Sequence, residues 1–302
     1  KTPLYHYASL NSMLSADVYV KHENHLPTGA FKVRGGINLI SRLSEDERRR
    51  GVIAASTGNH AQSVAFASKL FGVRALIVMP ENSNPLKVLA TKELGAEVIF
   101  HGKDFDEARE FAEELASKQN YRYIHSANEP LLIAGVATHT LEILEDLPNV
   151  DVIIVPVGGG SGAAGASIVA KSVNPKIRVI GVQSEKAPAA FKSWKDGKLV
   201  TDKSGTFAEG LATRVGFELT QRILRRLLDD FVLVSEEEIR NAMIAMIEKT
   251  HNLAEAAGAS PLAAAQRISS SLKGKKVVLI LSGGNTSLQH LREALLSYPG
   301  SR

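Results

Sequence analysis

The chain has 302 residues, which is long enough for a large core and two domains. It is 44% hydrophobic and 23% charged. It contains no Cys, which excludes disulfides, thiolate metal sites and a cysteine nucleophile. The net charge of +4 comes from scattered basic residues, so we predict no nucleic-acid partner. No apolar run reaches the roughly 18 residues of a membrane span, and no signal peptide opens the chain. We therefore expect a cytoplasmic protein with no membrane partner.

Strand and helix patterns alternate along the chain. Short apolar runs predict strands at 16–20, 52–55, 75–79, 97–100, 121–124, 151–157, 177–182 and 276–281. Helix patterns lie between them, with capping pairs at Asp104/Glu107 and Ser235/Glu238 and a long helix over 130–147. This alternation predicts an α/β fold with parallel sheets and helices on both faces.

The stretch Thr28-Gly-Ala-Phe-Lys-Val-Arg-Gly35 places Lys32 between two apolar side chains. Burial of a lysine lowers its pKa, and a lysine of low pKa can act as a Schiff-base nucleophile near neutral pH. A solvated lysine at the start of a surface helix is the alternative. On the spacing alone, that alternative is the better interpretation.

Three further stretches each follow an apolar strand: Ser56-Thr-Gly-Asn-His-Ala-Gln62, Gly158-Gly-Gly-Ser-Gly162 and Ser282-Gly-Gly-Asn285. Ligands of parallel sheets lie at the carboxyl ends of strands, so we expect these stretches to converge on one edge. Backbone N–H groups of a glycine loop that opens a helix suit a phosphate. Taken alone, each stretch could also be a simple cap or a tight turn.

The glycine stretch also fits a dinucleotide-binding pattern. Gly160-x-Gly162-x-x-Gly165 is followed some twenty residues later by Glu185. From this stretch alone, binding of a nicotinamide cofactor is the better hypothesis.

Together, in this order, the four stretches resemble the fold-type II enzymes that use pyridoxal phosphate, and most of all the threonine/serine dehydratases and serine racemases. The likeness runs from Thr2-Pro-Leu4 to Asn285. It implies two open parallel-type sheets, as in tryptophan synthase beta, with the cofactor between a large domain (1–44 and 131–302) and a small domain (45–130). The family usually has a helix before the Thr-Pro turn, so we expect a trimmed N-terminus. Since the chain ends soon after its last predicted helix, we expect no C-terminal regulatory domain.

The resemblance also implies roles for single residues. Pyridoxal 5′-phosphate would be bound covalently at Lys32, with Asn59 at its 3′-oxygen and Ser282 at its pyridine nitrogen. The other implied cofactor contacts are Phe31, Gly158, Gly159, Gly160, Ser161, Gly162, Glu209, Gly210 and Gly283. The substrate carboxylate would be held by Ser56, Thr57, Gly58, Asn59 and His60. Glu255 resembles a glutamate near the substrate pocket.

Several positions depart from the family. Thr57 stands where the racemases carry a catalytic serine, which weakens the case for racemisation because its methyl group restricts the rotamer. Gln183, Ala187 and Ala189 stand at the positions of the family's divalent-metal ligands. A neutral amide is a poor ligand for Mg²⁺, so we predict no divalent metal, although a monovalent cation is compatible with the sequence. Ala30 lacks the hydroxyl that the family usually places two residues before the lysine.

The resemblance implies an L-threonine/L-serine ammonia-lyase, which converts L-threonine to 2-oxobutanoate and ammonia and L-serine to pyruvate and ammonia. A homodimer is usual in the family. The nearest alternatives are a serine or other amino-acid racemase and a hydroxyaspartate dehydratase. From a different class, a nicotinamide-dependent or nucleotide-binding protein would use the 160–165 pattern. A ligand sensor without activity would leave Lys32 unexplained.

Overall fold

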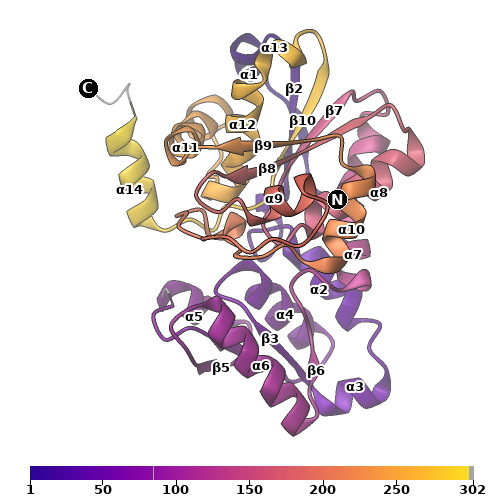
Figure 1. The fold of residues 1–302 in the computed structure, drawn as a ribbon, viewed down its shortest axis with the longest axis vertical. Helices are drawn as coiled ribbons and strands as arrows, with labels where there is room; N and C mark the ends of the chain where they lie inside the picture. Colours follow the sequence, from indigo (N-terminus) through magenta and orange to yellow (C-terminus); the bar gives the residue numbers. More distant parts are fainter. Residues whose placement is uncertain (84, 299–302) are drawn as a thin grey trace. The chain divides into compact units, whose positions relative to one another are not determined.

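The computed structural model describes residues 1–83 and 85–298, which form two compact units (Figure 1). The larger unit consists of Lys1–Phe31 and Ala137–Arg302, and the smaller one of Lys32–Val136. This grouping by contacts puts helix α2 (Lys32–Ile40) into the smaller unit, whereas the predicted boundary at 44/45 assigns it to the large domain. The predicted domain boundaries stay a prediction.

The larger unit is built on a six-stranded sheet with the order β1-β2-β10-β7-β8-β9. Its strands are β1 (Leu4–His6), β2 (Asp17–His22), β7 (Val152–Pro156), β8 (Arg178–Ser184), β9 (Asp230–Val234) and β10 (Lys276–Leu281). All neighbours are parallel except β1, which is antiparallel to β2. The central strands are almost entirely apolar, as expected for strands that are buried on both faces.

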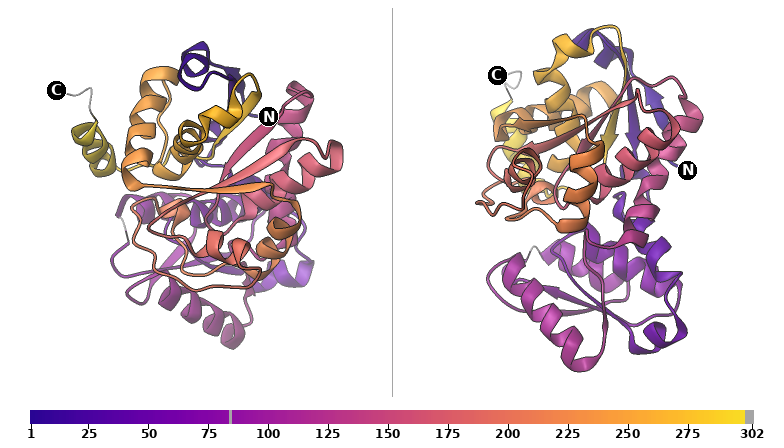
Figure 2. Two further views of the ribbon diagram at one scale, coloured as in Figure 1. Left: turned by 45° about the horizontal axis from the view of Figure 1, so that its top comes forward. Right: turned by 45° about the vertical axis from the view of Figure 1, so that its right-hand side comes forward.

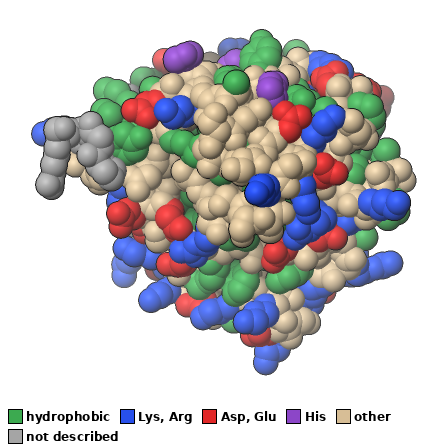
Figure 3. Space-filling model, turned by 90° about the horizontal axis from the view of Figure 1, so that it is seen from above, with side chains coloured by type: hydrophobic (Ala, Val, Ile, Leu, Met, Phe, Trp, Pro, Cys, Tyr) green, Lys and Arg blue, Asp and Glu red, His purple; other side chains and the backbone are tan. Residues whose placement is uncertain are grey.

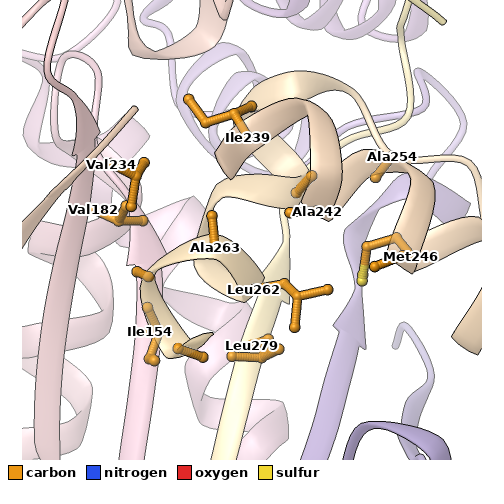
Figure 4. Packing of buried hydrophobic residues seen from close by; sticks show 14 of the residues in the cluster. Ile154, Val182, Val234, Ile239, Ala242, Met246, Ala254, Leu262, Ala263 and Leu279 are labelled. Atoms are coloured by element: carbon orange, nitrogen blue, oxygen red, sulfur yellow. The ribbon is translucent and has the colours of Figure 1, made fainter. Parts of the chain in front are cut away.

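Helices cover both faces of this sheet (Figure 2). Val152 and Ile154 pack into the core cluster that contains α12 (Ala256–Arg267) and α11 (Glu236–Thr250). Successive side chains of a strand point to opposite faces, and the neighbouring Val155 faces Gly162 at the start of α8 (Ser161–Val173). Hence α12 and α8 lie on opposite faces of the sheet. Most side chains of α12 are small, which suits a close approach of its backbone to the strands. Ala263 and Leu262 of this helix pack in one cluster with Ile154 and Leu279 of the sheet (Figure 4).

The remaining helices of the larger unit are shorter or peripheral. They are α1 (Ala8–Leu14), η1 (Glu23–His25), α9 (Ala189–Lys195), η2 (Glu209–Leu211), α10 (Glu218–Leu227), α13 (Ser269–Leu272) and α14 (Leu288–Ser297). Helix α7 (Pro130–Asp146) contributes residues to both units.

The smaller unit has a four-stranded parallel sheet with the order β5-β4-β3-β6. Its strands are β3 (Val52–Ala55), β4 (Ala75–Met79), β5 (Glu97–Phe100) and β6 (Arg122–Tyr123), and its helices, besides α2, are α3 (Glu45–Arg50), α4 (Asn59–Leu70), α5 (Pro85–Glu93) and α6 (Phe105–Gln119). Its core joins Ile53 and Val78 of the sheet to Ala108 and Ala112 of α6.

The predicted α/β fold with two parallel-type sheets is confirmed. One expectation was wrong in part: β7 and β10 are neighbours, but β3, which precedes Ser56, belongs to the other sheet. The capping box at Ser235 and Glu238 is formed. At Asp104 the side chain caps α6, but the carboxylate of Glu107 accepts from the backbone N–H of Lys103, so the predicted pair is not reciprocal.

The surface is mixed in charge. On the face shown in Figure 3, Lys and Arg side chains are interspersed with Asp and Glu. Among the described residues, none of the helices is both long and apolar enough to cross a bilayer.

Candidate active site

The stretch that ends at Phe31 pairs with the stretch after β10. The backbone N–H of Phe31 donates to Ser282 O at 2.9 Å, and that of Gly284 donates to Gly29 O at 2.9 Å. Ala30 forms a bridge with Gly283 between these two bonds. Residues 28–31 and the stretch Ser282–Asn285 therefore lie side by side in the larger unit. Ser282 is buried, directly after the end of β10.

The glycine loop, Gly158–Gly162, connects β7 to α8. Gly160 is the N-cap of α8 and has a φ of 88°, which favours glycine. A Cβ on Gly158 would lie 2.2 Å from Gly210 O, and one on Gly162 would lie 3.1 Å from the Phe31 ring. The loop therefore has no room for side chains at these two positions. With its backbone bare at the N-terminus of a 13-residue helix, it fits a phosphate group.

The turn η2 packs directly on this loop. Gly210 supplies the carbonyl that faces Gly158, and a Cβ on Gly210 would lie 2.7 Å from the Cβ of Ala257. Glu255, the N-cap of α12, lies against the end of β10, because its Oε1 would be 2.7 Å from a Cβ on Gly283. The turn at Glu209–Gly210, the glycine loop and the end of β10 thus form one continuous group in the larger unit.

Glu236 fixes the segment that leads into this turn, and no sequence pattern pointed to it. Its carboxylate is buried and accepts from Ser184 Oγ at 2.6 Å, Thr206 Oγ1 at 2.8 Å and the N–H of Phe207 at 3.0 Å. In the sequence it is one of three successive acids at the start of a helix, which is the pattern of a solvated helix end.

A further group of side chains gathers beside these residues in the larger unit. Phe31, Gly162 and Ser282 form it together with His139, a buried residue that the sequence did not suggest. The ring of His139 lies edge-on to Phe31 with centroids 6.3 Å apart.

Lys32 begins α2 in the smaller unit. Its carbonyl accepts from Ser63 Oγ at 2.6 Å, and Gly36 lets α2 approach α4 at that point, because a Cβ there would lie 2.3 Å from Ser63 Oγ. The amine donates to Ser126 O at 3.2 Å. Burial lowers the pKa of Lys32 to about 8. Lys32 does begin a helix, as the alternative interpretation assumed, but its amine is partly buried, bonded to Ser126 O and lowered in pKa.

The stretch from Ser56 to His60 leads from β3 into the first turn of α4 in the same unit. Ser56 Oγ accepts from the N–H of Gly58 at 3.2 Å. His60 is buried, and its Nε2 lies 3.3 Å from Ile124 O, so this nitrogen carries the proton. Burial, reinforced by the positive charge of Lys32, lowers the pKa of His60 to about 3. The ring is therefore neutral, and the N-terminal end of α4 is the part of this segment that suits an anion.

Comparison with known proteins shows the family to which this chain belongs. The model of the family described as "Pyridoxal-phosphate dependent enzyme" matches residues 1–283. The chain belongs to this family. It is 43% identical over 286 residues to L-threonine ammonia-lyase of Thermotoga maritima, covering 94% of this chain and 71% of that one.

Two solved structures are similar over nearly the whole chain. The processed form of threonine deaminase isoform 2 from Solanum lycopersicum has a TM-score of 0.94 at 34% identity, covering 99% of this chain and 88% of the other. Maize serine racemase has a TM-score of 0.91 at 33% identity, covering 98% and 91%.

The side-chain amide of Gln183 is hydrogen-bonded inside the larger unit. It is fully buried; its Oε1 accepts from the N–H of Phe191 at 3.0 Å, and its Nε2 lies 3.4 Å from both Leu211 O and Thr213 Oγ1. In the described parts of the chain, no three His, Cys, Asp or Glu side chains gather as a metal site would require. Glu185, the acid of the dinucleotide pattern, forms an ion pair with Arg267 at 2.8 Å.

Proposed function

We propose that this pyridoxal-phosphate enzyme is an L-threonine/L-serine ammonia-lyase, and the observation that carries the proposal is the lowered pKa of the partly buried Lys32 amine, which donates to Ser126 O at 3.2 Å. A pKa of about 8 leaves a useful fraction of the amine neutral near physiological pH, as a nucleophile and a general base require. The similarity to L-threonine ammonia-lyase of Thermotoga maritima, at 43% identity, supports the same reaction.

When bound, pyridoxal phosphate supplies an electron sink that acidifies the α-proton of an amino acid. We propose that Lys32 binds it covalently and that the glycine loop, including Gly159 and Ser161, holds its phosphate. The ring would be held by Phe31, Asn59, Glu209, Gly210, Ser282 and Gly283. Ser282 offers a neutral hydroxyl, which leaves a ring nitrogen less protonated than a carboxylate would.

The remaining steps fall to side chains and backbone groups of this chain. The amine of Lys32 would remove the α-proton of the substrate, and the β-hydroxyl would take up a proton and leave as water, so that the elimination removes one water molecule in all. We assign the substrate carboxylate to the stretch of Ser56, Thr57, Gly58, Asn59 and His60, at the N-terminal end of α4. His60 contributes its backbone, because its ring nitrogen Nε2 is held by Ile124 O. Release and hydrolysis give 2-oxobutanoate from threonine or pyruvate from serine, with ammonia in both cases.

Similarity to maize serine racemase favours one second candidate, an amino-acid racemase. Thr57 weakens it, because a threonine hydroxyl is more restricted than a serine hydroxyl. The resemblance to the family further supports a cytoplasmic homodimer, with domains at 1–44 with 131–302 and at 45–130. A monovalent cation is compatible with the buried amide of Gln183.

The test uses the full chain loaded with pyridoxal phosphate. We expect borohydride reduction and peptide mapping to place the cofactor on Lys32, and L-threonine to yield 2-oxobutanoate. Lys32→Ala should lose both the attachment and turnover. Full activity of Lys32→Ala would overturn the mechanism, and D-serine as the main product from L-serine would replace the lyase by the racemase. Binding of NAD(H) with no uptake of pyridoxal phosphate would overturn the cofactor assignment.

A further inference from the structure

The amine of Lys32 is held by a turn of the smaller unit that the sequence did not point to. This turn, residues 124–128, follows β6, and it begins where the N–H of Ile124 donates to Ile53 O at 2.8 Å. His60 Nε2 then donates to Ile124 O at 3.3 Å. Two residues later, the carbonyl of Ser126 accepts from Lys32 Nζ at 3.2 Å. The acceptor is a main-chain atom, so its direction depends on how the turn is built.

His125 builds the turn. Its Nδ1 accepts from the backbone N–H of Ala127 at 3.0 Å and from that of Asn128 at 3.0 Å. Because both partners are donors, Nδ1 is unprotonated and the ring proton is on Nε2. A side-chain acceptor that binds the N–H groups two and three residues later is the arrangement by which Asn and Asp stabilise turns.

The geometry of one peptide group links these bonds to Lys32. The carbonyl of Ser126 and the N–H of Ala127 belong to the same peptide, and in a trans peptide they point in opposite directions. His125 holds the N–H side of this peptide, and Lys32 lies on the carbonyl side. Fixing one side therefore fixes the direction of the other.

The surroundings of His125 keep it an acceptor. Burial lowers the pKa of His125 to about 4; the carboxylates of Glu113 and Glu129 oppose this shift, and the charges of Arg109 and Lys32 add to it. The ring is neutral at ordinary pH, and it lies edge-on to Tyr123 with centroids 6.3 Å apart. The two turn bonds are thus present under the conditions in which the enzyme would work.

We propose that His125 is a positioning residue for Lys32: it orients the Ser126–Ala127 peptide so that the Ser126 carbonyl holds the Lys32 amine in one place. This rests on the proposed role of Lys32 as the attachment point and base. A lysine side chain has four rotatable bonds and loses much rotamer freedom when it is fixed. A catalytic amine that is already held does not have to be ordered again at each turnover.

Two substitutions separate the acceptor from the ring. His125→Phe keeps an aromatic ring against Tyr123 but has no acceptor for the two N–H groups. His125→Asn loses the ring but offers Oδ1 in nearly the position of Nδ1. The full chain is compared in three measurements: hydrogen exchange of the Ala127 and Asn128 amides without cofactor, the rate at which the cofactor-free protein takes up pyridoxal phosphate, and kcat and KM for L-threonine.

In His125→Phe we expect exchange of both amides to rise by about tenfold, since about one net hydrogen bond's worth of protection is lost. Uptake of pyridoxal phosphate should slow, and kcat should fall by about 10- to 100-fold with KM nearly unchanged, as for a misplaced catalytic group. His125→Asn should restore all three to within a few-fold of the original protein.

Three results would overturn the proposal. One is fast amide exchange in His125→Phe with unchanged uptake and kcat, and another is a loss of kcat with the amides still protected. The third is a failure of His125→Asn to restore a folded, active protein, because the ring and not the acceptor would then matter. If the unaltered protein takes up the cofactor but does not convert threonine, the proposed reaction is wrong, while exchange and uptake still decide the role of His125.

Discussion

Substitution of Gly158 by alanine tests the packing of the glycine loop, because the added methyl group has no space. An ideal Cβ at this position lies 2.2 Å from Gly210 O and 3.1 Å from the carbonyl carbon of the same residue. The shorter distance is about 1 Å below a normal van der Waals contact. Both neighbours are backbone atoms, so relief requires the loop and the η2 turn to move apart. Overpacking of this kind costs about 1–3 kcal/mol.

For Gly158→Ala we expect the melting temperature of the cofactor-free protein to fall by about 2–10 °C, from this cost and the usual shift per kcal/mol in a chain of this size. The Kd of pyridoxal phosphate should rise by about tenfold or more, because a loss of about 1.4 kcal/mol at the proposed phosphate site is tenfold in affinity. Thermal unfolding followed by circular dichroism and a fluorescence titration with the cofactor measure the two quantities.

Gly205→Ala is the matched control. A Cβ on Gly205 would meet only Lys186 O, at 3.9 Å, and Gly205 does not have a positive φ. This substitution should leave both quantities nearly unchanged. If Gly158→Ala behaves like Gly205→Ala in melting temperature and in cofactor Kd, the close contact between the loop and the η2 turn does not exist in solution, and the reasoning from it fails.

Three further predictions test other parts of the structure. Lys32 has a pKa of about 8 in the folded state against an ordinary 10.5, so the unfolded chain binds more protons than the folded chain between these pH values. The free energy of unfolding of the cofactor-free protein should therefore rise over this pH range, relative to that of Lys32→Met. Urea unfolding at pH 7.5 and at pH 10 measures this, and equal changes in the two proteins would mean that the amine is solvated. Lys21 is fully buried, and its Nζ lies 2.6 Å from Glu142 Oε2. Lys21→Met should therefore lower the free energy of unfolding by about 3–5 kcal/mol, because it removes the ion-pair partner of the Glu142 carboxylate. The double variant Lys21→Met/Glu142→Leu should recover most of this loss in chemical unfolding, and no recovery would mean that packing and not charge is responsible. Ser235→Ala removes the capping box of α11 and should cost about 1 kcal/mol, and an unchanged unfolding midpoint would contradict the cap.

Much of the local structure could be predicted because its signals are local. The predicted limits of β3, β4, β5 and β10 agree with the structure, since short apolar runs closed by Gly, Pro or polar residues leave little freedom in where a strand ends. Strand order could not be predicted in the same way. The register of β10 between β2 and β7 depends on side chains more than a hundred residues apart, and no pattern within β3 reveals that it belongs to a second sheet.

The site divides along the same line. The glycine loop could be selected from the sequence because a close backbone approach excludes side chains and leaves glycine as its trace. Glu236 could not, because its partners Ser184 and Thr206 are far away in the chain and become neighbours only when β8 and α11 pack. From its own position Glu236 is an ordinary acid in the first turn of a helix.

The group that accepts a hydrogen bond from the Lys32 amine could not be predicted from the sequence either, and the reason is chemical. The group that accepts from the amine is a main-chain carbonyl, which every residue at position 126 would carry. The constraint on the sequence therefore moves to the neighbouring residue, which must offer an acceptor to the N–H on the other side of the same peptide. A histidine meets this need only while its Nδ1 is unprotonated, and burial ensures that by lowering its pKa to about 4. The residue that decides where the lysine lies is then one whose side chain need not touch it.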